Sequence, residues 1–262
     1  MVLPNNIYLG DCMKVMAGIA SESIDAIICD LPYNVLNKNN PNAQWDRPIS
    51  LKNLWKQYER IIKPNGAIIL FAQGMFTSDL MQSNRKLWRY NLIWDKGRST
   101  GFLNANRMPL RCHEDICVFY KQLPVYNPQM GIGQPNHSRG KSENPITNNC
   151  YGSFKTIWTK CDVIRSNEKF PQSIIHIQKE HKTTIYHPTQ KPVDLLRYLI
   201  RTYSSKGDVI LDNTMGGGST CVAAIIEKRK YIGIEKDPKY YRIAEARIKE
   251  VSRQLTLDFN TE

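Results

Sequence analysis

The amino-acid sequence predicts an α/β protein with a doubly wound, mostly parallel sheet. Two observations lead to this fold class. First, short apolar runs alternate with amphipathic helical patterns at both ends of the 262-residue chain, as in a parallel sheet with crossover helices. Second, polar clusters directly follow three apolar runs, at residues 30–33, 212–220 and 235–237. Because such a sheet binds ligands at the carboxyl ends of its strands, we expect the three clusters to line one site.

The first half of the chain supplies four predicted strands and two predicted helices. Residues 24–29 form a short apolar run, and a turn that contains a proline follows it. This pattern predicts a buried strand. Ser50 caps a helix whose apolar side chains fall on one face, and a second helix is expected at 75–88. The remaining strands are expected at 67–72, 91–94 and 115–120.

Regular alternation returns after His187. Pro192 opens a helix, and a strand, a glycine turn, a helix and a strand follow before a last helix begins near Pro238. The two strands are expected at 209–211 and 231–234. Residues 122–186 lack periodicity and are rich in Asn, Ser, Gly and Pro, so they predict an irregular insertion and not a second packed core.

Composition narrows the class of protein. The net charge of +12 favours a polyanionic partner such as nucleic acid. The seven cysteines are odd in number and include no CxxC pair, which argues against a disulfide framework or a zinc ribbon and fits a reducing cytoplasm. We expect no metal site. We also expect neither a secretory signal nor a membrane span, since no uninterrupted apolar run approaches ~18 residues.

The glycine turn at 212–220 joins a predicted strand to a predicted helix. Its glycines let a ligand approach the main chain, and the helix that follows offers free N–H groups to an anionic group. Glu235 lies about 20 residues on, the spacing at which an acid binds ribose hydroxyls. The pattern is not G-x-G-x-x-G, so a nicotinamide dehydrogenase is disfavoured. The alternative is a tight turn without a ligand.

The tetrapeptide Asp30-Leu31-Pro32-Tyr33 combines a carboxylate, a carbonyl, a rigid turn and an aromatic ring. Methylation of an aromatic amine requires acceptors that hydrogen-bond its N–H groups and free the nitrogen lone pair. Asp30 and the Leu31 carbonyl suit that role, while Pro32 fixes the turn and Tyr33 can stack on a base. The alternative is an ordinary turn between a strand and a loop.

These segments resemble the DNA methyltransferases that methylate amino groups. Residues 30–33 are similar to the family's Asp-Pro-Pro-Tyr, and residues 212–220 to its acid, Gly-x-Gly and Thr. Residues 187–192 match His-Pro-Thr-x-Lys-Pro in full, and Gly10-Asp11 is similar to the segment that contacts the cofactor adenine. The catalytic motif comes first and the cofactor motif last, as in the permuted β group. The implied fold is a Rossmann-like methyltransferase sheet with an irregular target-recognition insertion.

The resemblance implies a role for each matching residue. Asp30, Leu31, Pro32 and Tyr33 would hold the target base, and S-adenosylmethionine would be the cofactor. The residues expected to bind that cofactor are Asp11, Thr189, Lys191, Asp212, Gly216, Gly218 and Glu235. Of these, Thr189 and Lys191 are expected near its amino-acid end.

The first catalytic position also indicates the acceptor. An Asp there usually accompanies adenine in this family, so adenine N6 is the expected acceptor. Two positions depart from the family pattern. Leu31 replaces a Pro whose carbonyl is the working atom, and Asn213-Thr214 replaces Pro-Phe beside the cofactor.

A base in a duplex must be flipped out to reach Asp30. Two irregular segments carry cations that are expected to hold the phosphates: Arg98, Arg107, Arg111, Arg139 and Lys141. The expected division is a catalytic half at 1–121, a target-recognition region at 122–186 and a cofactor-binding half at 187–262. Duplex DNA is the expected partner, and the resemblance allows a homodimer and a cognate restriction endonuclease.

Other activities remain open at this stage. On the same fold, the acceptor can be cytosine N4, an RNA base or a protein glutamine amide, because each presents a planar nitrogen. A DNA-binding module that has lost catalysis is the alternative from another class. The intact Asp30 and the Gly216/Gly218 pair argue against that module.

Overall fold

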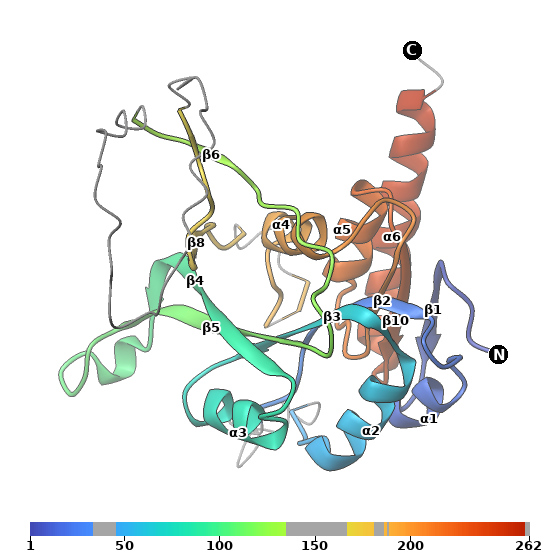
Figure 1. Ribbon diagram of the computed structural model, residues 1–262, viewed down its shortest axis with the longest axis horizontal. Coiled ribbons are helices and arrows are strands. Elements are labelled where there is room, and N and C mark those ends of the chain that lie inside the picture. The colour runs from blue at the N-terminus through green and yellow to red at the C-terminus, as the bar shows by residue number, and fades with distance from the viewer. Residues whose placement is uncertain (34–45, 135–166, 181–185, 188, 260–262) are drawn as a thin grey trace, which may run out of the picture. The chain divides into compact units, whose positions relative to one another are not determined.

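A computed structural model describes residues 1–33, 46–134, 167–180, 186–187 and 189–259 (Figure 1). The chain divides into two compact units, a larger one of residues 1–127 and 172–262 and a smaller one of residues 128–171. In the described part of the smaller unit, β6 (Gly131–Ile132) pairs antiparallel with β7 (Glu168–Lys169). The role of residues 122–186 in target recognition stays a prediction.

The larger unit contains an eight-stranded sheet in the order β1-β10-β9-β2-β3-β5-β4-β8. Every pairing in it is parallel except those of β5 with β3 and β4, so β5 alone of these strands runs against the others. The predicted mostly parallel sheet is thereby confirmed. The strands are β1 (Asn6–Leu9), β2 (Ile24–Asp30), β3 (Ile62–Ala72), β4 (Trp88–Thr100), β5 (Arg111–Tyr120), β8 (Ile174–His176), β9 (Val209–Asp212) and β10 (Lys230–Glu235).

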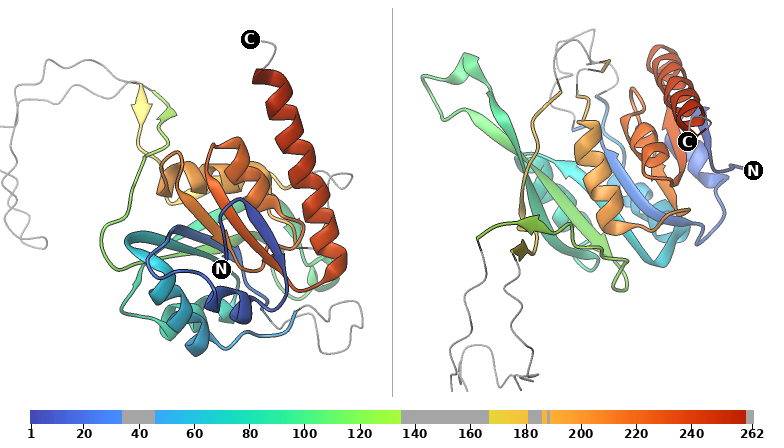
Figure 2. Two further views of the ribbon diagram at one scale, coloured as in Figure 1. Left: turned by 90° about the vertical axis from the view of Figure 1, so that its right-hand side faces the viewer. Right: turned by 90° about the horizontal axis from the view of Figure 1, so that it is seen from above.

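Helices cover both faces of this sheet, as a doubly wound fold requires (Figures 1 and 2). One face carries α1 (Cys12–Ala17), α2 (Leu51–Ile61) and α3 (Met75–Ser83), and the other carries α4 (Val193–Tyr203), α5 (Ser219–Ile226) and α6 (Pro238–Phe259). Alternate side chains of β2 divide between the two cores. Ile27 and Cys29 pack with α1 and α2, whereas Ala26 and Ile28 pack with α4 and α5.

The structure corrects three local expectations. The helix expected at 75–88 ends at Ser83, because Asn84 leaves the helical region with φ −149°, and the apolar residues that follow begin β4. The strands expected at 91–94 and 115–120 are parts of a longer antiparallel hairpin, so the loop between them shrinks to 101–110 and contains a short 3-10 turn, η2 (Phe102–Asn104). The polar outer part of this hairpin has no buried face, and apolar alternation therefore gives no sign of it.

The order β10-β9-β2 explains why distant segments share a site. Asp30 is the last residue of β2, Asp212 the last of β9 and Glu235 the last of β10. These neighbouring strands are parallel, so their carboxyl ends lie at one edge of the sheet. The three polar clusters of the sequence therefore meet there.

Candidate active site

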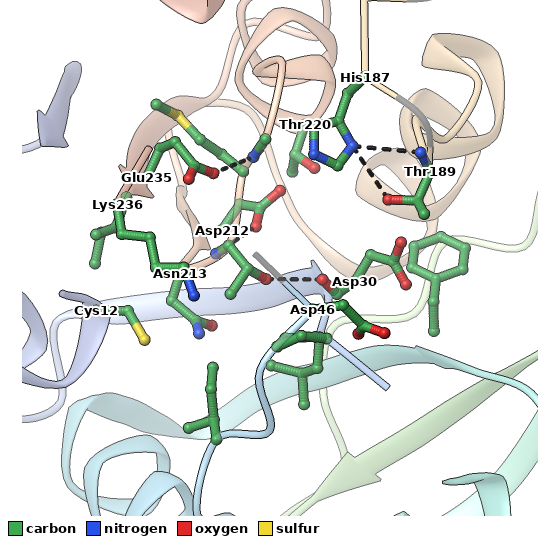
Figure 3. Close-up of a pocket in the computed structure, with 18 of the residues that line it drawn as sticks. Cys12, Asp30, Asp46, His187, Thr189, Asp212, Asn213, Thr220, Glu235 and Lys236 are labelled. Atoms are coloured by element: carbon green, nitrogen blue, oxygen red, sulfur yellow. Dashed lines mark hydrogen bonds between the residues drawn. The ribbon is translucent and has the colours of Figure 1, made fainter. Parts of the chain in front are cut away.

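A cavity of about 550 Å³ lies at this edge. Its lining includes all four residues of 30–33, the glycine turn 212–217 and Glu235, together with Asp11 and Lys191 (Figure 3). The Thr214 hydroxyl donates a 2.9 Å hydrogen bond to the backbone carbonyl of Asp30, which joins two segments 184 residues apart. The tetrapeptide and the glycine turn thus line a single pocket.

The glycine turn is held open by backbone geometry that glycine supplies. Gly216 and Gly218 have φ of +50° and +78°, in the left-handed region. At Gly218 a Cβ atom would lie 2.8 Å from the Cβ of Ala244 on α6, so a side chain would push α5 and α6 apart. Glu235 accepts hydrogen bonds from the Gly216 N–H at 3.0 Å and the Asp237 N–H at 2.8 Å. Its carboxylate therefore fixes the turn and still has lone pairs for a ligand.

Asp212 carries the most perturbed carboxylate at this edge. Its pKa is raised from 3.8 to about 7, mainly by burial. The negative charges of Asp30 and Glu235 also raise this pKa, whereas hydrogen bonds from Thr220 and from the Thr214 N–H lower it. A cation bound here would favour the ionised form, so this end of the cavity suits a positively charged ligand.

Asp30 lies in a chain of buried charges. Its Oδ1 accepts a 2.6 Å hydrogen bond from the Tyr33 hydroxyl, and its Oδ2 pairs with the Lys191 ammonium. Lys191 also lies 3.3 Å from Glu114 Oε2, and Glu114 Oε1 lies 3.4 Å from the Lys96 ammonium. Glu114 and Lys96 were not predicted as site residues. No local motif marks them, because β4 and β5 bring them to the site only through strand pairing.

The segment before α4 places Lys191 and Thr189 at different parts of the pocket. Lys191 points to the tetrapeptide, whereas the Thr189 hydroxyl lies 3.2 Å from the His187 ring nitrogen Nδ1 (Figure 3). Burial and the positive charge of Lys191 lower the pKa of His187 to about 4, so the imidazole is neutral at neutral pH. The expected contact of Lys191 with the amino-acid end of a cofactor stays a prediction.

Four more of the predicted residues line the cavity: Asp11, Leu31, Pro32 and Tyr33. The Asp11 carboxylate caps α1 by accepting from the N–H groups of Met13 and Lys14 at 2.9 and 3.2 Å. Leu31 and Pro32 follow β2 directly, and the Leu31 side chain is buried. The Tyr33 ring packs on Phe76 of α3, with 4.8 Å between ring centroids.

The donors and acceptors of the cavity fit S-adenosylmethionine. Asn213 forms part of its wall, and its buried Nδ2 has only the Cys12 thiol, a weak acceptor, beside it in the described chain, which leaves a donor for a ligand. Its Oδ1 is fixed by a 2.5 Å hydrogen bond from Tyr58. The carboxylates of the cavity suit the ammonium, sulfonium and ribose groups of this cofactor. The glycine turn has no bulky side chains at its glycines, so the cofactor can approach the main chain there closely.

The predicted DNA contacts divide into two sets. Arg98, Arg107 and Arg111 lie exposed on the β4–β5 hairpin and its tip, and none of them takes part in an ion pair within the described ranges. Arg139 and Lys141 fall outside the residues that the structure describes. Phosphate contact stays a prediction for all five.

The doubly wound sheet, with a cavity at the carboxyl ends of its parallel strands, places the chain in the Rossmann-like α/β class of ligand-binding folds. In fold the chain is similar to the M1.HpyAVI–SAM complex, with a TM-score of 0.61, 21% identity and coverage of 93% of this chain and 98% of that one. It is also similar to the cytosine-N4-specific PvuII DNA methyltransferase, with a TM-score of 0.66, 14% identity and coverage of 100% and 95%.

The particular family follows from the sequence. The chain belongs to the N6/N4 DNA methylase family, whose model matches residues 24–246. It is 28% identical to the type II methyltransferase M.HinfI of Haemophilus influenzae over 94% of this chain and 69% of that protein. It is 26% identical to the type II methyltransferase M2.MboI of Moraxella bovis over 97% and 91%. As a member of this family the chain uses S-adenosylmethionine as its methyl donor.

None of the helices among the described residues combines the length and apolarity needed to cross a membrane. Among the same residues, no group of three or more His, Cys, Asp or Glu side chains is placed to hold a metal ion.

The raised pKa of Asp212 predicts that this residue, which is expected to bind the cofactor, lowers the stability of the folded protein at neutral and higher pH. The folded protein holds this proton up to about pH 7, whereas the unfolded chain releases it near 3.8, so stability from Asp212 falls as pH rises through that window. The substitution Asp212→Asn removes this pH-dependent loss of stability, because the amide does not ionise. We expect its free energy of unfolding to exceed that of the wild type at pH 8 by on the order of 2–4 kcal/mol, with a smaller difference at pH 4.

Denaturant unfolding at both pH values measures this difference, and calorimetry should show weaker cofactor binding by the variant. Asp194→Asn on α4, whose carboxylate is 77% exposed, serves as the control. A difference between Asp212→Asn and wild type that stays constant from pH 4 to 8 would contradict the assignment.

Proposed function

We propose that this protein methylates adenine N6 in duplex DNA at a specific site, after flipping the target base into the cavity. The observation that carries the proposal is the placement of Asp30 beside the glycine turn, tied to it by the Thr214 hydrogen bond. Family membership supports an amino group of DNA as the acceptor. The choice of adenine over cytosine rests on the Asp at the first position of the tetrapeptide.

In this proposal Asp30 and Leu31 activate the amine. The Asp30 carboxylate and the Leu31 carbonyl accept hydrogen bonds from the two amino N–H groups, which draws the nitrogen lone pair out of the ring. Tyr33 supplies the stacking surface, and its packing on Phe76 fixes the ring. Ionisation of Asp30 is required, because a protonated carboxyl would offer a donor where the amine needs an acceptor.

S-adenosylmethionine supplies a methyl group on a positively charged sulfur when it is bound. The chain's contribution is to hold the amine in line with that carbon. The bound cofactor would supply the methyl group by direct displacement and leave as a neutral thioether. The amino proton that the nitrogen loses would pass to water by way of the Asp30 carboxylate, to which that N–H group donates in this proposal. Asp212 and Glu235 would fix the donor's charged and ribose groups from the neighbouring strands, while Thr214 keeps Asp30 in register with them.

The β4–β5 hairpin is the proposed duplex contact of the larger unit. It extends beyond the helical layers (Figure 1). Arg98, Arg107 and Arg111 provide three exposed cations along it. Its tip exposes Phe102 and Leu103, which are 72% and 101% exposed. Apolar side chains flanked by arginines suit insertion between bases with the cations on phosphates.

We also place the protein in a restriction–modification system, because the relatives M.HinfI and M2.MboI are named type II methyltransferases. A cognate restriction endonuclease and a homodimer are the partners this proposal adds. DNA from cells expressing the protein should carry one modified motif when it is sequenced by a method that reads modified bases. If the modified base were N4-methylcytosine, cytosine N4 would replace adenine N6 as the acceptor, and the other parts of the proposal would stand.

Asp30→Ala should abolish methyl transfer and leave cofactor affinity nearly unchanged. Losing one preorganised catalytic hydrogen bond costs about 100-fold or more in rate. Single-turnover methylation of duplex DNA and calorimetry with S-adenosylmethionine measure the two effects separately. Asp194→Ala on α4 is the matched control, and full activity of Asp30→Ala would refute the role given to Asp30.

Replacement of Arg98, Arg107 and Arg111 together by Ala should weaken duplex binding and flatten its salt dependence. Removing three phosphate contacts lowers the slope of log K against log salt by about 2 to 3. The control removes three exposed cations from α6, which packs against β1 at the other end of the sheet from β4: Lys239, Arg242 and Lys249. If the two triple variants had equal slopes of log K against log salt, the hairpin would not be part of the DNA interface.

A further inference from the structure

Both oxygens of the Asp30 carboxylate are already occupied by the protein's own donors. Tyr33 fills Oδ1 with a 2.6 Å hydrogen bond, and the Lys191 ammonium fills Oδ2. The side chain of Asp30 is 17% exposed and that of Lys191 is 8% exposed, so solvent does little to loosen this pair. An amine that arrives in the cavity therefore has to share the Asp30 carboxylate with both of these donors or displace one of them.

Glu114 offers Lys191 a second partner. Its Oε2 is buried and lies 3.3 Å from the Lys191 ammonium, which makes a closer contact with Asp30. Lys191 therefore already bridges the two carboxylates, and Glu114 is the less closely held of its partners. Lys191 lines the cavity and Glu114 does not, so a move toward Glu114 takes the ammonium out of the space for a base. The Phe71 ring, with its centroid 5.0 Å from the ammonium, forms another contact of Lys191.

We infer that Lys191 is a placeholder for the target amino group, and that it passes from Asp30 to Glu114 when the base enters. The inference rests on the proposed function, since it requires an amine as the incoming group. Lys191 and Glu114 are positioning residues in it, because neither contacts the reacting atoms. Lys96 holds the other oxygen of Glu114 at 3.4 Å and keeps that carboxylate in place.

Charge balance makes the exchange feasible. Two lysines and two carboxylates form the chain Lys96–Glu114–Lys191–Asp30, and its formal charge is zero before and after the move. A buried carboxylate that loses its only cation would be strongly destabilised. Here Asp30 exchanges the ammonium for a neutral N–H donor but keeps the hydrogen bond from Tyr33, and the positive charge of Lys191 stays in the same chain of charges, beside Glu114.

The two positioning residues have opposite effects on the ionisation of Asp30. Burial raises the pKa of Asp30, Lys191 lowers it, and Glu114 raises it. The other titratable groups that act on Asp30 or line its surroundings stay unchanged in the variants below: Cys29, Tyr33, Asp46, Lys179, His187 and Asp212. Removing Lys191 should therefore raise the pKa of Asp30, and removing Glu114 should lower it.

The test compares Glu114→Gln with Lys191→Met in single-turnover methylation of duplex DNA, over the whole pH range in which the folded protein and the duplex are both stable. For Lys191→Met, we expect the acid limb of the rate profile to move to higher pH and the rate to approach that of the wild type at high pH. For Glu114→Gln, the limb should move to lower pH. Its plateau should fall by about tenfold or more, because the ammonium has no charged acceptor to receive it.

Glu227→Gln is the matched control, since Glu227 is also a nearly buried carboxylate and holds Arg197 and Arg201 away from the cavity. Thermal melts and cofactor calorimetry separate loss of folding from loss of exchange. An unchanged plateau in folded Glu114→Gln, or limbs that move in the same direction in both variants, would overturn the inference. Failure of the wild type to methylate DNA would instead remove the proposed function.

Discussion

The negative charge of Asp30 must be kept at the buried end of a parallel strand, and the rest of the site depends on that constraint. Burial favours the protonated carboxyl, which is a weaker acceptor for an amine than the carboxylate and turns one of its two oxygens into a donor. Lys191 supplies the compensating charge from a segment 161 residues away in the sequence. The fold therefore has to bring both ends of the chain together before the tetrapeptide can work.

The same edge holds two more carboxylates, which take part in none of the ion pairs identified among the described residues. Asp212 and Glu235 end the strands next to β2, and burial raises the pKa of both. In the proposed arrangement Lys191 compensates Asp30, whereas Asp212 and Glu235 leave negative charge at the end of the cavity proposed for the cofactor. The ammonium and sulfonium groups of S-adenosylmethionine would balance this negative charge. In this proposal, charge therefore distinguishes the end of the cavity that binds the base from the end that binds the cofactor.

The sequence predicted the parts of this site that follow from local rules. A strand that ends in Asp30, a glycine turn after Asp212 and an acid at Glu235 are each visible in a short window, and the parallel topology brings them together. Glu114 and Lys96 escaped prediction because their place depends on the pairing of β4 with β5. The overlong helix at 75–88 has a related cause, since the apolar residues Leu87 and Trp88 continue a helical spacing but lie in or next to a strand.

The most direct measurement of the central claim is a crystal structure of the protein with its recognition duplex and a non-reactive analogue of S-adenosylmethionine. The account predicts a flipped adenine whose N6 hydrogen-bonds the Asp30 carboxylate and the Leu31 carbonyl, with the analogue on the glycine turn and the Lys191 ammonium on Glu114. A target base bound away from Asp30, or an analogue bound outside the cavity that joins residues 30–33 to the glycine turn, would contradict it.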